Sequence, residues 1–176
     1  MLSTLPLDQL IALGRQRWLV LLLAEFHRQR GARFVELLNR LGLPRDSLVR
    51  ALEVAIKSGW VTRNPGYGHP LRSEYVLSDE GKGVAAAAAG IAEVLANAKL
   101  TPEQLTRWSL PVLRALSGGY ERFNELERHL VQATPRALAM TLRALAENGL
   151  VDRLVEAGFP PTSRYRLTSR GAALTP

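Results

Sequence analysis

The chain repeats its own pattern at a nearly constant offset of 90 residues. Pairs with this offset are Trp18/Trp108, Leu48/Leu138, Gly59/Gly149, Tyr75/Tyr165 and Gly81/Gly171. Phe34 and Phe123 are 89 residues apart, so the first copy carries one extra residue between its Trp and its Phe. A long repeat with a fixed period indicates that one supersecondary unit was duplicated. The chain therefore has to fold as two related units in one covalent piece.

Each copy is small for an independent fold. Units of roughly 70 residues lie near the lower limit for a self-sufficient hydrophobic core. We therefore expect the two copies to pack on each other.

The charge balance favours a polyanionic partner, nucleic acid before an acidic membrane surface. The 176 residues carry a formal net charge of +7, and 20 of the 23 basic residues are Arg. A GC-rich genome would produce the same Arg excess, and that alternative stays open. The chain has no Cys, which excludes disulfides and thiolate metal sites. The apolar run 18–26 is too short to span a bilayer and is broken by Glu25, so we expect a soluble cytoplasmic, nucleoid-associated protein.

Hydrophobic periodicity predicts the same order of elements in both copies. In the first copy it predicts helices over 5–13, 15–28, 34–41 and from Pro44 to before Gly59, then strands over 60–63 and 74–77. In the second copy it predicts helices over 105–117, 121–131 and 135–148, then strands over 150–154 and 163–168. Each copy thus ends in a two-stranded hairpin.

Three helices followed by a hairpin are the plan of a winged helix-turn-helix. We therefore predict a mainly α fold with small β-hairpin wings (α+β). The predicted domains are a first winged helix with an N-terminal helix (1–81), a linker (82–104) and a second winged helix (105–176). Residues 79–98 include five consecutive alanines and read as a helix with a small-residue face, which suits close, dimer-like helix packing. A solvent-exposed alanine-rich spacer is the alternative.

Three motifs of the second copy resemble a known family. They are Arg122-Phe-Asn-Glu-Leu126, Gly149-Leu-Val-Asp-Arg153 and the wing Pro160-Pro161…Tyr165-Arg-Leu-Thr168…Gly171. Together they resemble the HxlR family of bacterial winged-helix regulators, which is related to the MarR group. The first copy is a diverged version, with Arg33-Phe-Val-Glu-Leu37, Gly59-Trp-Val-Thr-Arg63 and Tyr75-Val-Leu-Ser-Asp-Glu-Gly81. The resemblance covers residues 15–81 and 105–174.

Members of that family are homodimers with one winged helix per chain, and they bind operator DNA. The resemblance implies that this chain is a tandem, covalent pseudo-dimer whose partner is double-stranded DNA. Two departures matter. Family members often sense through an N-terminal Cys, and this chain has none. They also carry a C-terminal dimerisation helix; the second copy stops before one, so only the linker could take that role.

The candidate DNA contacts follow from helix geometry. The outward face of the second recognition helix holds Arg136, Met140, Arg143 and Glu147, and its first turn offers Thr134 and Arg136 to base edges. In the first copy the base-reading candidates are Arg45, Ser47 and Arg50, on a face that Asp46 and Glu53 bring close to neutral. Candidate phosphate and minor-groove contacts, on the wings and before each helix-start Phe, are Arg33, Arg63, Arg72, Arg122, Arg153 and Arg164.

The sequence shows no recognisable catalytic, metal or phosphate-loop motif, so we expect neither an enzyme nor a cofactor. The leading interpretation is a sequence-specific DNA-binding transcriptional regulator, a repressor, that contacts two adjacent half-sites. The alternative is a tandem winged-helix adaptor that binds proteins. A small-molecule effector stays open, with Trp18, Trp60 and Trp108 as candidates to line a pocket between the copies, although core packing explains them better. The oligomeric state is open between a monomeric pseudo-dimer and a further homodimer.

Overall fold

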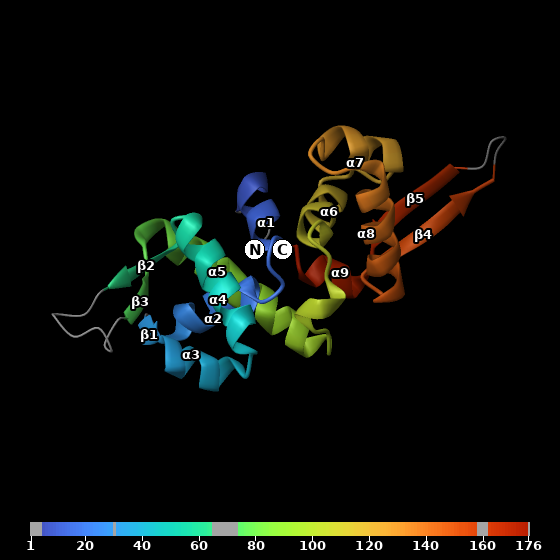
Figure 1. Cartoon of the computed structure of the whole chain (residues 1–176). Coiled ribbons are helices and arrows are strands. Elements are labelled where there is room, and N and C mark those ends of the chain that lie inside the picture. The colour runs from blue at the N-terminus through green and yellow to red at the C-terminus, as the bar shows by residue number, and fades with distance from the viewer. Residues whose placement is uncertain (1–4, 30, 65–73, 158–161, 176) are drawn as a thin grey trace. The chain divides into compact units, whose positions relative to one another are not determined.

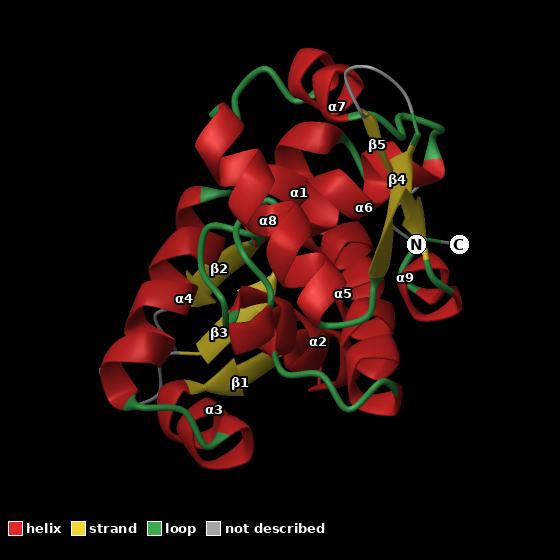
Figure 2. Cartoon of the chain, turned by 90° about the vertical axis from the view of Figure 1, so that its right-hand side faces the viewer, coloured by secondary structure: helices red, strands yellow, loops and turns green. Residues whose placement is uncertain are grey.

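The computed structural model describes residues 5–29, 31–64, 74–157 and 162–175, and they divide into two compact units (Figure 1). We call Arg15–Glu93 the first-copy unit and Met1–Gly14 with Val94–Pro176 the second-copy unit. Both are mainly helical, with short antiparallel strands (Figure 2). This confirms the predicted balance of helix and strand. Among the described residues, no helix has the length and apolar character needed to cross a membrane.

The first-copy unit builds its helices around a three-stranded sheet of order β1-β3-β2. Its core is mainly leucine and alanine, and Phe26 is its largest fully buried side chain. The elements are α2 (Leu19–Gln29), β1 (Gly31–Arg33), α3 (Phe34–Leu41), α4 (Arg45–Lys57), β2 (Val61–Asn64), β3 (Glu74–Leu77) and α5 (Asp79–Asn97), whose last residues belong to the second-copy unit.

The second-copy unit repeats this arrangement with a two-stranded sheet. A single antiparallel bridge from Arg122 to Arg164 stands where the first copy has β1 paired with β3. The elements are α1 (Leu7–Leu13), η3 (Pro102–Gln104), α6 (Ser109–Ser117), α7 (Phe123–His129), α8 (Pro135–Glu147), β4 (Val151–Glu156), β5 (Thr162–Leu167) and α9 (Ser169–Ala173).

The helix predicted from residue 105 begins later, at Ser109. Residues 101–104 (Thr-Pro-Glu-Gln) have the pattern of a helix start but cap only the short η3 turn, in which the Thr101 N–H donates to Gln104 Oε1 at 2.7 Å. The chain then turns, and the Thr106 N–H donates to Ser109 Oγ at 2.9 Å. A capping signature fixes where a helical turn starts but not how far it continues. The short elements β1 and α9 were not predicted.

The N-terminal helix does not lie with the first winged helix. We expect residues 1–81 to form one domain, whereas α1 packs on α6 of the second-copy unit. The Arg114 guanidinium donates to the Leu5 carbonyl oxygen. Gly14 lies so close to Arg107 that an added β-carbon would be 2.0 Å from its carbonyl oxygen. The apolar face of α1 could cover either copy, and only the tertiary contacts select one.

The duplicated glycines form the same contact in both copies, which we call the wing clamp. Ser78 Oγ donates to the Gly59 carbonyl oxygen (2.6 Å) and accepts from the Gly81 N–H (2.9 Å). In the second copy, Thr168 Oγ1 does the same with Gly149 (2.8 Å) and Gly171 (3.1 Å). The clamp ties the start of the helix after the wing to the turn that ends the third helix. It thereby fixes each wing relative to its recognition helix.

Candidate nucleic-acid interface

The second recognition helix, α8, begins at a well-made cap. Thr134 is extended, and its Oγ1 accepts from the Ala137 N–H at 3.2 Å, with Pro135 at the first helical position. Such a cap satisfies one of the free N–H groups at a helix start. The buried face of α8 consists of Leu138, Thr141, Leu142 and Leu145.

The opposite face of α8 is exposed and carries the predicted candidates. Arg136, Met140, Arg143 and Glu147 all face solvent. Arg143 Nε lies 2.8 Å from Glu147 Oε1, one helical turn further on, and this ion pair raises the pKa of Arg143 above its ordinary value. Within the described part of the chain, Arg136 makes no ion pair, so it is the uncompensated cation of the first turn.

The first recognition helix, α4, starts at Pro44 without a side-chain cap. It buries Leu48, Ala51, Leu52 and Ala55, and its exposed face carries Arg45, Asp46, Arg50, Glu53 and Lys57. The Arg45 guanidinium lies 5.1 Å from the centre of the Phe34 ring, a cation–π contact between α4 and α3. Ser47 is half-buried, and its carbonyl oxygen accepts from Gln16 Nε2 at 3.3 Å.

These contacts reduce the contrast that the sequence predicts between the two faces. The exposed charges of the two faces sum to the same value, since α4 carries three bases and two acids and α8 carries two arginines and one acid, and that acid, Glu147, pairs with Arg143. On α4, Arg50 makes no ion pair among the described residues. Among the described residues, exposed arginines without an ion pair are therefore Arg136 on α8 and Arg50 and Arg45 on α4, the last of which contacts the Phe34 ring.

The repeated Arg-Phe-x-Glu-Leu motif forms the start of a helix in both copies. The Arg33 N–H donates to Glu36 Oε2 and the Arg122 N–H donates to Glu125 Oε2, each at 2.9 Å. The leucine after each Glu is fully buried. The motif therefore needs its Glu and its Leu for capping and packing, while the Arg side chain is left for other contacts.

The arginines of the second wing are engaged with two glutamates. Arg164 Nε lies 2.6 Å from Glu156 Oε1, and Arg164 Nη1 lies 3.5 Å from Glu121 Oε2. Arg122 Nη2 lies 3.6 Å from the other Glu156 oxygen, and Arg166 Nε lies 3.2 Å from Glu121 Oε1. We call Glu121, Glu156, Arg122, Arg164 and Arg166 the wing network. Two of the predicted phosphate contacts, Arg122 and Arg164, are thus partly neutralised.

The remaining wing candidates lie on strands. The Arg153 side chain of β4 donates to Ser163 Oγ of β5 through Nε (3.2 Å) and Nη2 (3.1 Å). Arg63 is exposed on β2. Arg33 is exposed before α3, whereas Arg72 lies outside the described residues.

The two glutamates of the wing network could not be predicted from the sequence as partners of these arginines. Glu121 precedes α7 and is distant in sequence from Arg164, whereas Glu156 ends β4 and reaches Arg164 of β5 across the hairpin. No helical or strand periodicity links them to Arg164. The only available signal is that acids stand near the end of a predicted strand, and such an acid is usually a solvated surface charge.

Comparison with known proteins assigns the fold to a family. The family model for HxlR-like helix-turn-helix proteins matches residues 13–100 and 105–176, once for each copy. The chain belongs to the HxlR-like helix-turn-helix family. The two matched segments confirm that the HxlR-like unit occurs twice in tandem, and membership in this helix-turn-helix family agrees with the expectation that the chain is not an enzyme.

The curated relatives of this HxlR-like chain are regulators by name. It is 39% identical over 70 residues to an uncharacterized HTH-type transcriptional regulator of Methanothermobacter thermautotrophicus, covering 40% of this chain and 53% of the relative. It is 35% identical over 66 residues to the uncharacterized HTH-type transcriptional regulator YtfH of Escherichia coli (strain K12), covering 38% and 52%. The chain spans about half the length of these relatives.

Among solved structures, the HxlR-like chain is similar to a transcriptional regulator of the MarR family from Enterococcus faecalis V583. The sequence identity is 30%, the match covers 55% of this chain and 76% of that chain, and the TM-score is 0.38.

Proposed function

We propose that this chain is a DNA-binding transcriptional regulator that contacts two adjacent half-sites as a covalent pseudo-dimer. The observation that carries the proposal is the duplicated helix-turn-helix, in which α4 and α8 each turn an exposed, arginine-bearing face away from their core. A recognition helix presented in this way fits the major groove, where bidentate arginine contacts select guanine. The net charge of +7 supplies the general attraction to phosphate.

We assign base contacts to Thr134, Arg136 and Arg143 on α8 and to Arg45, Ser47 and Arg50 on α4. Arg136 is the strongest of these, because it lies in the first turn of α8 and is uncompensated. Arg33, Arg63, Arg72, Arg122, Arg153 and Arg164 are assigned to phosphates or the minor groove. On this assignment, Arg122 and Arg164 contact DNA only after giving up part of their attraction to Glu156.

The proposal is tested by selecting bound sequences from random duplex DNA at two salt concentrations, followed by footprinting. We expect an imperfect palindrome with half-site centres about 10 bp apart, or a multiple of this distance. The logarithm of the affinity should fall with the logarithm of the salt concentration. Binding without salt dependence, or protection of a single half-site, would contradict the proposal.

A matched pair of variants identifies the contact surface. Arg136→Ala should weaken specific binding by about 1–3 kcal/mol and relax the preference at one base pair. Arg17→Ala removes the same charge from an exposed position ahead of α2, outside both recognition helices and both wings. It should leave the base preference unchanged. Equal losses in the two variants would mean that net charge alone carries the binding.

We further propose that the regulator represses, by occupying DNA that the transcription machinery needs. A reporter placed behind the selected site should be silenced by the wild-type chain and released by Arg136→Ala. Increased reporter output with the wild-type chain would show activation instead.

A protein-binding adaptor is the second candidate, and α4 favours it. The acids Asp46 and Glu53 alternate with the bases of its exposed face, and Ile56 on the same helix is 41% exposed. Such a mixed surface fits a protein partner as well as DNA. If the selection experiment yields no preferred sequence, this second function replaces the first.

A further inference from the structure

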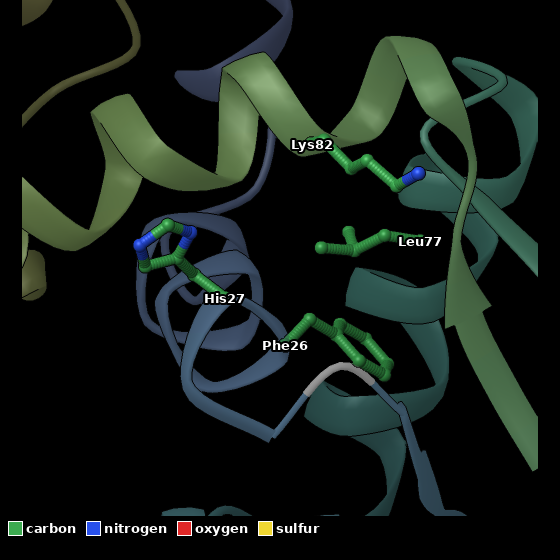
Figure 3. Close-up of a pocket in the computed structure, with 4 residues that line it drawn as sticks. All are labelled: Phe26, His27, Leu77 and Lys82. Atoms are coloured by element: carbon green, nitrogen blue, oxygen red, sulfur yellow. The ribbon is translucent and has the colours of Figure 1, made fainter.

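The first-copy unit contains a cavity of about 670 Å³ lined by Phe26, His27, Leu77 and Lys82 (Figure 3). Its volume lies within the range of small-molecule sites. The lining residues come from α2, the end of β3 and the first turns of α5. All four of these residues belong to the first-copy unit.

The cavity has an apolar floor and a polar mouth. Phe26 is fully buried, and Leu77 points into the space between α2 and α5. His27 and Lys82 are exposed and stand on opposite sides of this space. The Lys82 ammonium lies 2.6 Å from Asp79 Oδ1, on the same helix. An apolar floor with a cation and an imidazole at the mouth suits an amphipathic molecule with one negative charge.

The repeat offers an internal comparison for this site. At the offset of 90 residues, Phe26, His27 and Lys82 correspond to Leu116, Ser117 and Ala172, while Leu77 corresponds to Leu167. The second copy thus keeps an apolar floor and lacks both polar groups of the mouth. His27 and Lys82 are exposed, so neither is needed for the common fold, and their presence in one copy calls for a separate explanation.

We propose that this cavity binds a small apolar monocarboxylate, that Lys82 holds its carboxylate while His27 lines the opposite side of the mouth, and that binding changes the affinity of the chain for DNA. The last part rests on the proposed function. The contacts suggest how binding reaches the DNA-binding elements. Leu77 is followed by Ser78, whose hydroxyl forms the wing clamp with Gly81 and with Gly59 at the end of α4. A molecule packed against Leu77 therefore touches the base of the wing and, through one residue, the end of the recognition helix.

Binding is measured first without DNA, by calorimetry on the full chain. The probes are 4-phenylbutyrate, its neutral amide and the matching amine. We expect the carboxylate to bind, the amide to bind about three- to fivefold more weakly, and the amine not to bind. Equal binding of carboxylate and amide, preference for the amine, or no binding at millimolar concentration would overturn the proposal.

Variants place the binding in this cavity. Lys82→Gln should lower the affinity for the carboxylate about three- to fivefold, the same factor as between carboxylate and amide, and should leave the affinity for the amide unchanged. Lys57→Gln, at an exposed lysine of α4 in the same unit, is the matched control in the absence of DNA and should leave the affinity for the carboxylate unchanged. The double variant His27→Ser with Lys82→Ala introduces the residue types that the second copy has at the corresponding positions, Ser117 and Ala172. In this variant the carboxylate and the amide should bind with equal affinity. If Lys57→Gln lowers the affinity as much, a general charge effect is at work and the site is wrong.

Asp79→Asn removes the competing partner of Lys82. This substitution should raise the affinity for the carboxylate about two- to threefold, a change opposite in direction to that of Lys82→Gln. Weaker binding in this variant would contradict the assignment of Lys82 as the group that holds the carboxylate.

The regulatory part is measured separately, as DNA affinity with and without 4-phenylbutyrate. We expect a shift of at least threefold, lost in Lys82→Gln. If 4-phenylbutyrate binds but the affinity for DNA is unchanged, the regulatory part of the proposal is wrong and the ligand site is still supported. If the chain binds no DNA at all, the proposed function fails, and the calorimetry still decides whether the cavity takes the carboxylate.

Discussion

Gly171 packs against the backbone of Leu150 so closely that a β-carbon added to it would lie 2.0 Å from the Leu150 carbonyl oxygen. In the first copy, Gly81 stands in the same relation to Trp60, at 1.9 Å. Both glycines start the helix that follows a wing. Their repetition 90 residues apart therefore reflects a packing requirement of the wing clamp, which no other residue meets.

We expect Gly171→Ala to lower the free energy of unfolding by about 2 kcal/mol, because the methyl group forces the backbone of two elements apart. Gly83→Ala is the control: Gly83 lies within α5, and an added β-carbon would meet nothing within 4 Å. That change should raise the stability by about 0.5–1 kcal/mol through helix propensity. Urea unfolding measures both, and equal midpoints for the two variants would refute the packing argument.

If Arg143 contacts bases as proposed, Glu147 competes with DNA for it. The substitution Glu147→Gln removes the carboxylate that lies 2.8 Å from Arg143 Nε and leaves an exposed side chain of similar size. We expect operator affinity to rise about two- to fivefold at low salt, since an exposed pair of this kind is worth under about 1 kcal/mol. Glu103→Gln, an exposed acid outside α8, tests whether net charge alone explains the change. The same gain from Glu103→Gln would remove Arg143 from the contact surface.

Glu156→Gln should release Arg122 from the wing network and leave Arg164 with Glu121 as its remaining acidic partner. The ion pairs are partly exposed, so we expect the free energy of unfolding to change by no more than about 0.5 kcal/mol. The loss of this carboxylate should raise DNA affinity without changing the preferred sequence, and the salt dependence should become steeper. A changed base preference would show that the second wing contacts bases rather than phosphates. Unchanged affinity and salt dependence would show that neither arginine contacts DNA.

Lys82 holds the pKa of the Asp79 carboxyl below its ordinary value, through a hydrogen bond and through its charge. A carboxyl whose pKa is lowered on folding stabilises the folded chain above the pKa of the unfolded state, and this contribution is lost as the pH falls through the folded-state pKa. Both groups are exposed, so the contribution is small. NMR titration should find the pKa of Asp79 below the ordinary range in the wild type and back within it in Lys82→Gln. An unchanged pKa in the variant would mean that the pair does not form in solution.

Much of each copy could be predicted from local patterns. Leu48, Leu52 and Ala55 recur at helical spacing and are all buried on α4. Residues 34–41 are predicted as a helix and found as one. These predictions succeed because a helix with one apolar stripe needs only its own neighbours to be recognised. The Glu of the Arg-Phe-x-Glu-Leu motif acts over three residues, so its role is likewise local.

The candidate interface could be predicted only in part, because charge pairing is a matter of tertiary contact. The helical period places Arg143 on the outward face, and it also places Glu147 one turn away. Nothing in the sequence brings Glu121 and Glu156 to Arg164, since strand register and the position of α7 decide that contact. Two of the predicted phosphate contacts, Arg122 and Arg164, therefore form ion pairs that the sequence does not indicate.

The sequence by itself determined that one helix-turn-helix unit occurs twice, where its helices and wings lie, and which faces of α4 and α8 turn outward. Periodicity and repetition carry that information, and both are properties of neighbouring positions along the chain. The tertiary structure decided that α1 packs on α6, that two glutamates partly neutralise Arg122, Arg164 and Arg166, and that Phe26 and Leu77 form the floor of a cavity with His27 and Lys82 at its mouth. These are contacts between different helices and strands, and they exist only once the elements have packed.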